Sequence, residues 1–155
     1  MTQHPGLQSA LDLFNKVERE LARLETAVSA DTYFNFAITA YHICDWVEKD
    51  STLPKAARRE LESLRQQLPI QICRDIANGS KHFGVNYSDP VVADATCVTG
   101  YGMGRYGKGA YGVGEPKIQV TLADGSLLDG LDIARQAVQL WRTFFTKHAL
   151  AGSAV

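Results

Sequence analysis

The organisation of the chain follows from residues 33–47, whose sequence is YFNFAITAYHICDWV. Apolar and small side chains occur on nearly every face of a helix drawn through this stretch, so such a helix has to be covered on most sides. Ser29 or Asp31 can cap its beginning, because a short polar side chain accepts hydrogen bonds from the first free backbone N–H groups. We therefore expect residues 33–47 to form the central helix of the fold.

The flanking segments have the pattern of helices that cover a central one. Residues 7–24 place leucine, phenylalanine or valine at every third or fourth position, which is typical of an amphipathic helix. Pro54 suits the first turn of a further helix, and Pro69 then forces a break or a sharp kink. The next helix is predicted from about Ile70 to Asn78. Gly79 is its expected end, although the helix can continue to Phe83.

The character of the chain changes after Gly84. Residues 94–101 and 117–122 read as strands, and residues 123–126 as a turn. The last helix is predicted at residues 131–149. We expect one mainly α domain over residues 1–155, a four- to five-helix bundle with an inserted β-hairpin before the last helix. The hairpin and its glycine-rich loop occupy about residues 94–123.

Composition narrows the class of protein. The chain has 155 residues, 45% hydrophobic content and a formal net charge of −1, which argues against nucleic-acid binding by bulk positive charge. No signal peptide and no apolar run long enough to span a membrane are seen. Three cysteines at irregular spacing favour neither a disulfide framework nor a zinc finger. We expect a cytoplasmic protein with no membrane partner.

Two polar clusters interrupt the apolar helices. One lies on the central helix, at His42 and Asp45, and the other lies at the end of the fourth helix. Burying such groups costs free energy unless each finds a partner, so we expect the two clusters to satisfy each other across a helix–helix interface. The resulting polar seam contains His42, Asp45, Arg74, Asp75, Asn78, Lys81 and His82.

Residue chemistry alone leaves two interpretations of this seam open. In the first, the polar side chains only fix the register of two packed helices. In the second, His42, Asp45, Asp75 and His82 bind zinc, iron or manganese, whose preferred ligands they are. Their spacing is not a recognised metal signature, so no metal or cofactor is assigned.

A third interpretation comes from a family resemblance. The tyrosine-bearing helix with its His42/Asp45 cluster, followed by a helix that carries Arg74 and closes with Lys81 and His82, resembles the HEPN superfamily. The resemblance covers about residues 5–83 and the last helix. It implies a helical bundle, commonly dimeric and often found in toxin–antitoxin or defence systems. Active members cut RNA without a metal, using an arginine followed by four to six residues and a histidine.

The chemistry that the resemblance implies can be assigned to residues of this chain. His82 is the candidate general base or acid near neutral pH. Arg74 or Lys81 would stabilise negative charge on the phosphate oxygens. Seven residues separate Arg74 from His82, one more than the family pattern. An ideal helix would therefore place the two about 12 Å apart along its axis.

Residues 101–115 repeat a tyrosine–glycine unit three times. So much glycine favours a flexible hairpin tip. Alternatively, the tyrosines and the neighbouring cations form an arm that stacks on bases or docks on a protein. The residues of that arm are Tyr101, Arg105, Tyr106, Lys108 and Tyr111.

The sequence thus predicts an RNA- or nucleotide-directed helical protein, cleaving or binding RNA. One alternative is a non-catalytic structural or interaction module whose polar seam only holds helices together. A second is a metal-binding helical bundle. We expect a homodimer, with RNA or a nucleotide as a candidate ligand and a protein as a candidate partner of the tyrosine–glycine loop.

Overall fold

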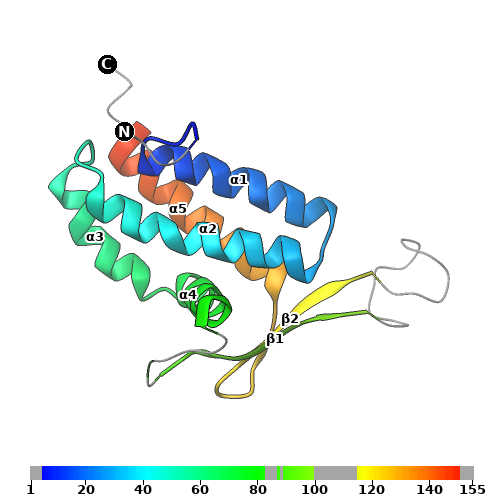
Figure 1. Ribbon diagram of the computed structural model, residues 1–155. Helices are drawn as coiled ribbons and strands as arrows, with labels where there is room; N and C mark the ends of the chain where they lie inside the picture. Colours follow the sequence, from blue (N-terminus) through cyan, green and yellow to red (C-terminus); the bar gives the residue numbers. More distant parts are fainter. Residues whose placement is uncertain (1–4, 83–86, 88, 100–114, 151–155) are drawn as a thin grey trace.

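The computed structural model describes residues 5–82, 87, 89–99 and 115–150, limited to the backbone at residues 80–82 and 150. It is mainly α, with a small antiparallel sheet before the last long helix (Figure 1), which confirms the predicted fold class. The elements in chain order are α1 (Ala10–Thr26), α2 (Ala30–Lys49), α3 (Lys55–Arg65), α4 (Leu68–His82), β1 (Val92–Val98), β2 (Lys117–Leu122), β3 (Leu127–Asp129), α5 (Gly130–Phe145) and a short π-helix, η1 (Thr146–Leu150).

Helix α2 is the central element, as its apolar sequence predicts. It contacts α1, α3, α4 and α5, and Phe36, Ala40 and Ile43 on it are completely buried. The indole N–H of Trp141 on α5 donates a hydrogen bond of 3.0 Å to the backbone carbonyl of Ala40. This bond gives the buried indole the partner that it needs, because an unpaired N–H in the core is costly.

The first two helices begin at serine caps. Ser9 and Asp12 form a capping box at the start of α1, and Ser29 with Thr32 forms another at the start of α2. In each box, two side chains satisfy backbone N–H groups that have no partner inside the helix. Of the two predicted caps for α2, Ser29 is therefore the one in use.

The chain breaks between α3 and α4, as Pro69 predicts. Two details of the predicted helix bounds differ from the structure. Pro69 lies in the first turn of α4, where its missing N–H removes no helical hydrogen bond. Leu68 begins α4, two residues earlier than predicted, and is 38% exposed. Gly79 does not end α4, which continues to His82.

The sheet has three strands in the order β1-β2-β3, all antiparallel. Ile118 and Val120 of β2 are buried and alternate with less buried neighbours, as predicted, and they join the same apolar core as the helices. The predicted first strand at residues 94–101 is observed at Val92–Val98 instead, with a register shift between Val92 and Asp94. β3 was not predicted, because its three residues are too few to show alternation.

The sheet lies beside one end of the helical bundle, close to α4 and the beginning of α5 (Figure 1). Asp129 caps α5 by accepting a hydrogen bond from the N–H of Leu131 at 2.8 Å. In the part of the chain that is described, no helix combines the length and the apolar character needed to cross a bilayer.

Candidate functional site

The strongest polar cluster of the fold surrounds Asp75 on α4, whose side chain is almost fully buried, with 4% of the residue surface exposed. One carboxylate oxygen accepts hydrogen bonds from the Arg74 Nε at 2.9 Å and from the Tyr87 hydroxyl. The other oxygen accepts the backbone N–H of Val91 at 2.6 Å and that of Val92 at 3.0 Å. Both oxygens are thus occupied by donors, as a buried carboxylate requires.

Arg74 and Tyr87 complete this cluster, which we call the Asp75 network (Arg74, Asp75, Asn78 and Tyr87). The Arg74 guanidinium carbon lies 4.7 Å from the centre of the Tyr87 ring, within the range of a cation–π contact. Burial and the bond to Asp75 raise the pKa of Tyr87, and the nearby Asn78 side chain opposes this shift. Burial alone would lower the pKa of Arg74, but the hydrogen bond and the charge of Asp75 raise it above its ordinary value. The guanidinium therefore stays charged.

The Asp75 network ties α4 to the sheet. Val91 and Val92 lie at the beginning of β1, so the Asp75 carboxylate satisfies two backbone N–H groups where this strand starts. Unpaired N–H groups on an edge strand can form hydrogen bonds with a strand of another chain. Here the Asp75 carboxylate occupies two such N–H groups, so they are not open to that pairing. Within the described residues, no buried side-chain nitrogen or oxygen lacks a hydrogen-bond partner. The Asp75 carboxylate therefore connects α4 to the start of β1.

The predicted catalytic residues Arg74, Lys81 and His82 lie on one continuous helix. Because α4 does not end at Gly79, the seven intervening residues are helical, and the backbones of Arg74 and His82 lie about 12 Å apart along the axis. The side chains of Lys81 and His82 are outside the described part of the structure. The backbone alone does not bring Arg74 and His82 together within one chain.

His42 and Asp45 do not pack against Asp75, and the predicted buried seam is wrong in this respect. Both residues are exposed on α2, whereas Asp75 has its four donors on Arg74, Tyr87, Val91 and Val92. The physical reason is the competition for the buried face of α2. Small and apolar side chains take that face, because burying an imidazole and a carboxylate would cost more free energy.

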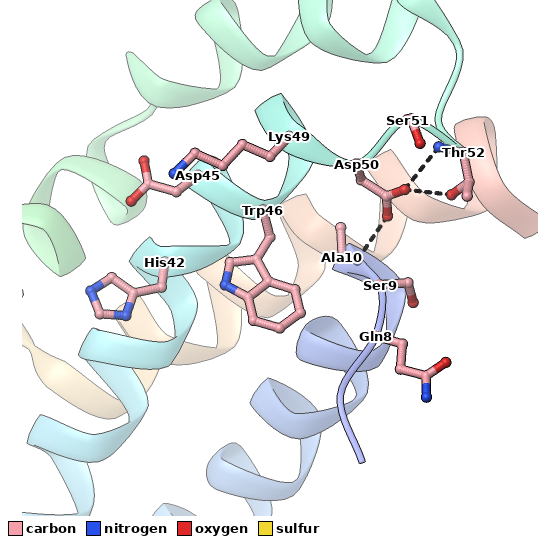
Figure 2. A pocket seen from close by; sticks show the side chains of 10 residues that line it. All are labelled: Gln8, Ser9, Ala10, His42, Asp45, Trp46, Lys49, Asp50, Ser51 and Thr52. Atoms are coloured by element: carbon pink, nitrogen blue, oxygen red, sulfur yellow. Dashed lines mark hydrogen bonds between the residues drawn. The ribbon is translucent and has the colours of Figure 1, made fainter. Parts of the chain in front are cut away.

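His42 and Asp45 instead line a surface pocket of about 520 Å³ between α2 and the segment that enters α1 (Figure 2). The Trp46 ring projects into it, with His42 on one side and the residues before α1 on the other. The remaining lining residues are Gln8, Ser9, Ala10, Lys49, Asp50, Ser51 and Thr52. A pocket of this size is within the range of small-molecule sites.

Asp50 holds the two walls of this pocket together. Its carboxylate accepts the backbone N–H of Ala10 at 2.9 Å, across forty residues of sequence, and that of Thr52 at 2.9 Å (Figure 2). Burial would raise the pKa of Asp50, but the hydrogen bonds from Thr52 and Ala10 lower it, so the group is a charged cap. Asp50 and Trp46 were not predicted as site residues.

The metal-binding alternative finds no support among the residues that the structure describes, which contain no group of three or more histidine, cysteine, aspartate or glutamate side chains suited to a metal ion. Cys44 and Cys73 are not candidate nucleophiles. Burial raises the pKa of Cys44 to about 11 and that of Cys73 to about 12, so both thiols stay protonated near neutral pH.

The tyrosine–glycine loop falls in residues 100–114, outside the described part of the chain. This applies to Tyr101, Arg105, Tyr106, Lys108 and Tyr111. Their predicted role as a stacking arm stays a prediction.

Sequence reasoning missed Tyr87, the hydroxyl donor to Asp75. A signal existed, because a lone aspartate between Cys73 and Ile76 in an apolar helix needs donors from another segment. Nothing in the residues around Tyr87 identifies that segment, since Tyr87 lies outside the helices and strands and twelve positions after Asp75.

Comparisons of the chain with protein-family models, with curated proteins and with solved structures found no match. The resemblance to the HEPN superfamily therefore stays a prediction.

Proposed function

We propose that this chain is a non-catalytic interaction module, in which the Asp75 network is structural and joins the sheet to the helical bundle. The observation that carries the proposal is the complete occupation of the Asp75 carboxylate by four donors. A carboxylate that acts in catalysis needs an open position for substrate or for a proton, and this one has none.

The contacts that Arg74 already makes within the chain support the same proposal. Its guanidinium is bound to Asp75 through Nε at 2.9 Å and Nη2 at 2.8 Å and lies over the Tyr87 ring. An arginine that stabilises a developing phosphate charge has to direct its N–H groups at the substrate. Here two of the guanidinium nitrogens already bond a neighbour in the same chain.

A cleavage assay tests this function. End-labelled RNA is incubated with the wild-type chain, with His82→Ala and with His4→Ala as a control at the other end of the chain. We expect all three to leave the RNA as intact as a protein-free sample does. Cleavage by the wild type and by His4→Ala that His82→Ala loses would contradict the proposal.

RNA-directed cleavage by a homodimer is the second candidate function. The observation in its favour is that the Arg74 side chain keeps 27% of its surface exposed on the same helix that carries His82. In this candidate, Arg74 of one copy and His82 of another would meet at the dimer interface, with Lys81 beside them, as the HEPN resemblance implies.

Complementation distinguishes the homodimer from a single-chain centre. Arg74→Ala and His82→Ala are each inactive in this candidate, and mixing the two variants restores part of the cleavage because one mixed site keeps both residues. Light scattering on the same samples has to show a dimer. A monomer, or a mixture as inactive as its components, contradicts this candidate.

The proposed module acts in a reducing compartment, the cytoplasm, which the three free thiols of Cys44, Cys73 and Cys97 support. Its partner is proposed to be a protein that docks on the tyrosine–glycine loop. Deletion of residues 102–114 should abolish co-purification of that partner. Unchanged co-purification would remove the loop from the proposal.

A further inference from the structure

The exposed side of α2 carries an unusual stripe beside the pocket of Figure 2. His42, Asp45, Trp46 and Lys49 are spaced three, four and seven residues from the first, so they share one helix face. The two tryptophans of the chain differ sharply in surroundings. Trp141 is completely buried, whereas Trp46 is only half-buried and its ring lines the pocket. A large aromatic ring at a surface hollow is typical of a binding site.

The walls of the pocket are held in place before any ligand arrives. Asp50 links Ala10 at the start of α1 to Thr52 after α2, and the Ser9–Asp12 capping box holds the entering segment. These bonds join parts of the chain that are distant in sequence. A preformed pocket loses little free energy to ordering when it binds a ligand.

The polar groups of the stripe suit a ligand whose ring edge carries both hydrogen-bond donors and acceptors. They suit a ligand with a single charged group less well. Asp45 offers acceptor oxygens and Lys49 offers donor hydrogens, and their opposite charges lie one helical turn apart. Asp50 is a further carboxylate at the pocket, although its oxygens already accept Ala10 and Thr52. The pocket therefore has no excess of positive charge with which to hold a phosphate.

We infer that this pocket binds a planar heteroaromatic ring whose edge carries both hydrogen-bond donors and acceptors, a purine or a pterin. The ring lies against Trp46, Asp45 accepts hydrogen bonds from the N–H groups of the ring edge, and Lys49 donates to a ring carbonyl or nitrogen. The pocket shares no residue with the Asp75 network, so the inference does not depend on the proposed function.

The two tryptophans supply a direct readout. In a ¹⁵N–¹H correlation spectrum of the full chain, the two indole N–H signals are assigned from the Trp46→Phe variant. Guanosine, guanosine 5′-monophosphate and pterin are titrated separately. We expect at least one of these rings to shift the Trp46 signal to saturation and to leave the Trp141 signal in place. Saturation by guanosine or by pterin identifies which ring the pocket takes.

Variants test the assigned contacts. Asp45→Asn should weaken binding about tenfold, since it replaces a charged acceptor. Asp31→Asn, which changes another exposed aspartate at the opposite end of α2, should leave binding unchanged. Trp46→Ala should abolish binding. If that variant does not fold, Asp45→Asn and Asp31→Asn still decide the matter.

The charge of the ligand gives a further test. The monophosphate should bind no more tightly than guanosine, and added salt should have little effect on either. The inference is overturned if none of the three probes shifts the Trp46 signal, if Asp45→Asn binds as wild type does, or if binding requires the phosphate.

Discussion

At the scale of single residues, Asp75 shows how one buried charge can organise two segments. All four of its partners are donors, contributed by Arg74, Tyr87, Val91 and Val92. A carboxylate is the side chain that suits this position, because it presents only acceptors. The same property makes the position intolerant of an amide, whose NH₂ group would face a donor.

Removal of the Tyr87 hydroxyl tests one bond of the Asp75 network. Tyr87→Phe should lower the free energy of unfolding by about 1–2 kcal/mol, because it deletes a hydrogen bond to a charged acceptor and keeps the ring over Arg74. Tyr41→Phe is the matched control, since no hydrogen bond of its hydroxyl is found among the described residues. Urea denaturation measures both. Equal effects of the two substitutions would contradict the assigned role of Tyr87.

A second prediction for a single residue concerns Glu60 on α3, which connects η1 to the helical bundle. Its Oε2 lies 2.7 Å from the Lys147 ammonium and 2.7 Å from His148 Nε2. Lys147 and then His148 lower the pKa of Glu60. A lowered pKa in the folded state means that the ionised group stabilises the fold above its ordinary pKa, and that this contribution is lost as the pH falls through the lowered value.

Glu60→Gln should therefore reduce the free energy of unfolding by about 1 kcal/mol or less at neutral pH, the range of partly exposed ion pairs. The difference from wild type should shrink on acidification. Thermal unfolding at neutral and acidic pH checks this. A difference that grows as the pH falls would have the wrong sign.

The contacts of individual side chains were the features that the sequence predicted least well. The choice of Asp75 and Asn78 as network residues needed only their polarity within an apolar helix. To place His42 and Asp45 correctly, one has to know how α2 is rotated about its own axis. The sequence does not determine that rotation, because apolar residues lie on several faces of α2. Tyr87 belongs to no helix or strand, so no periodic signal could identify its contact.

At the scale of elements, α4 differs from its prediction at Gly79. Glycine favours a helix end because it adopts positive φ at no cost, yet Gly79 lies inside the helix. A glycine is therefore only a local signal for a helix end, and it did not decide where α4 stops. Helix α2, by contrast, was predictable as the central element because its apolar residues outnumber what one covered face needs.

The glycines of α4 and α5 supply a matched pair of predictions. Among the residues that the structure describes, a Cβ added at Gly79 would have no heavy atom of another group within 4 Å. Gly79→Ala should therefore stabilise the chain by about 0.5–1 kcal/mol, the gain from the better helix former. Circular dichroism during thermal unfolding measures it. A loss of stability would mean that Gly79 is needed for its backbone freedom.

The other member of the pair is Gly130, the first residue of α5. A Cβ there would lie 2.5 Å from Ile118 Cγ2 and 3.0 Å from Tyr33 Cζ, too close for either buried side chain. Gly130→Ala should cost about 1–3 kcal/mol through overpacking where β2 meets the helices. Stability equal to wild type would show that this contact is looser than the distances indicate.

At the scale of the whole molecule, the fold consists of a helical bundle and a small sheet that share one apolar core. This arrangement was predictable, because the change from helical to alternating periodicity after Gly84 is visible in the residues themselves. The manner of attachment was not. Apolar contacts of Ile118 and Val120 act together with the buried Asp75 network, and the second contribution depends on a contact between distant segments.

The most direct test of the structural role of the Asp75 network is the free energy of unfolding of Asp75→Asn, with Asp94→Asn on exposed β1 as its control. Asp75→Asn should lose about 2–4 kcal/mol, because an amide leaves buried donors unpaired, and the control should stay within about 0.5 kcal/mol of wild type. If Asp75→Asn is as stable as the control, the network does not hold the sheet to the helices, and the account fails.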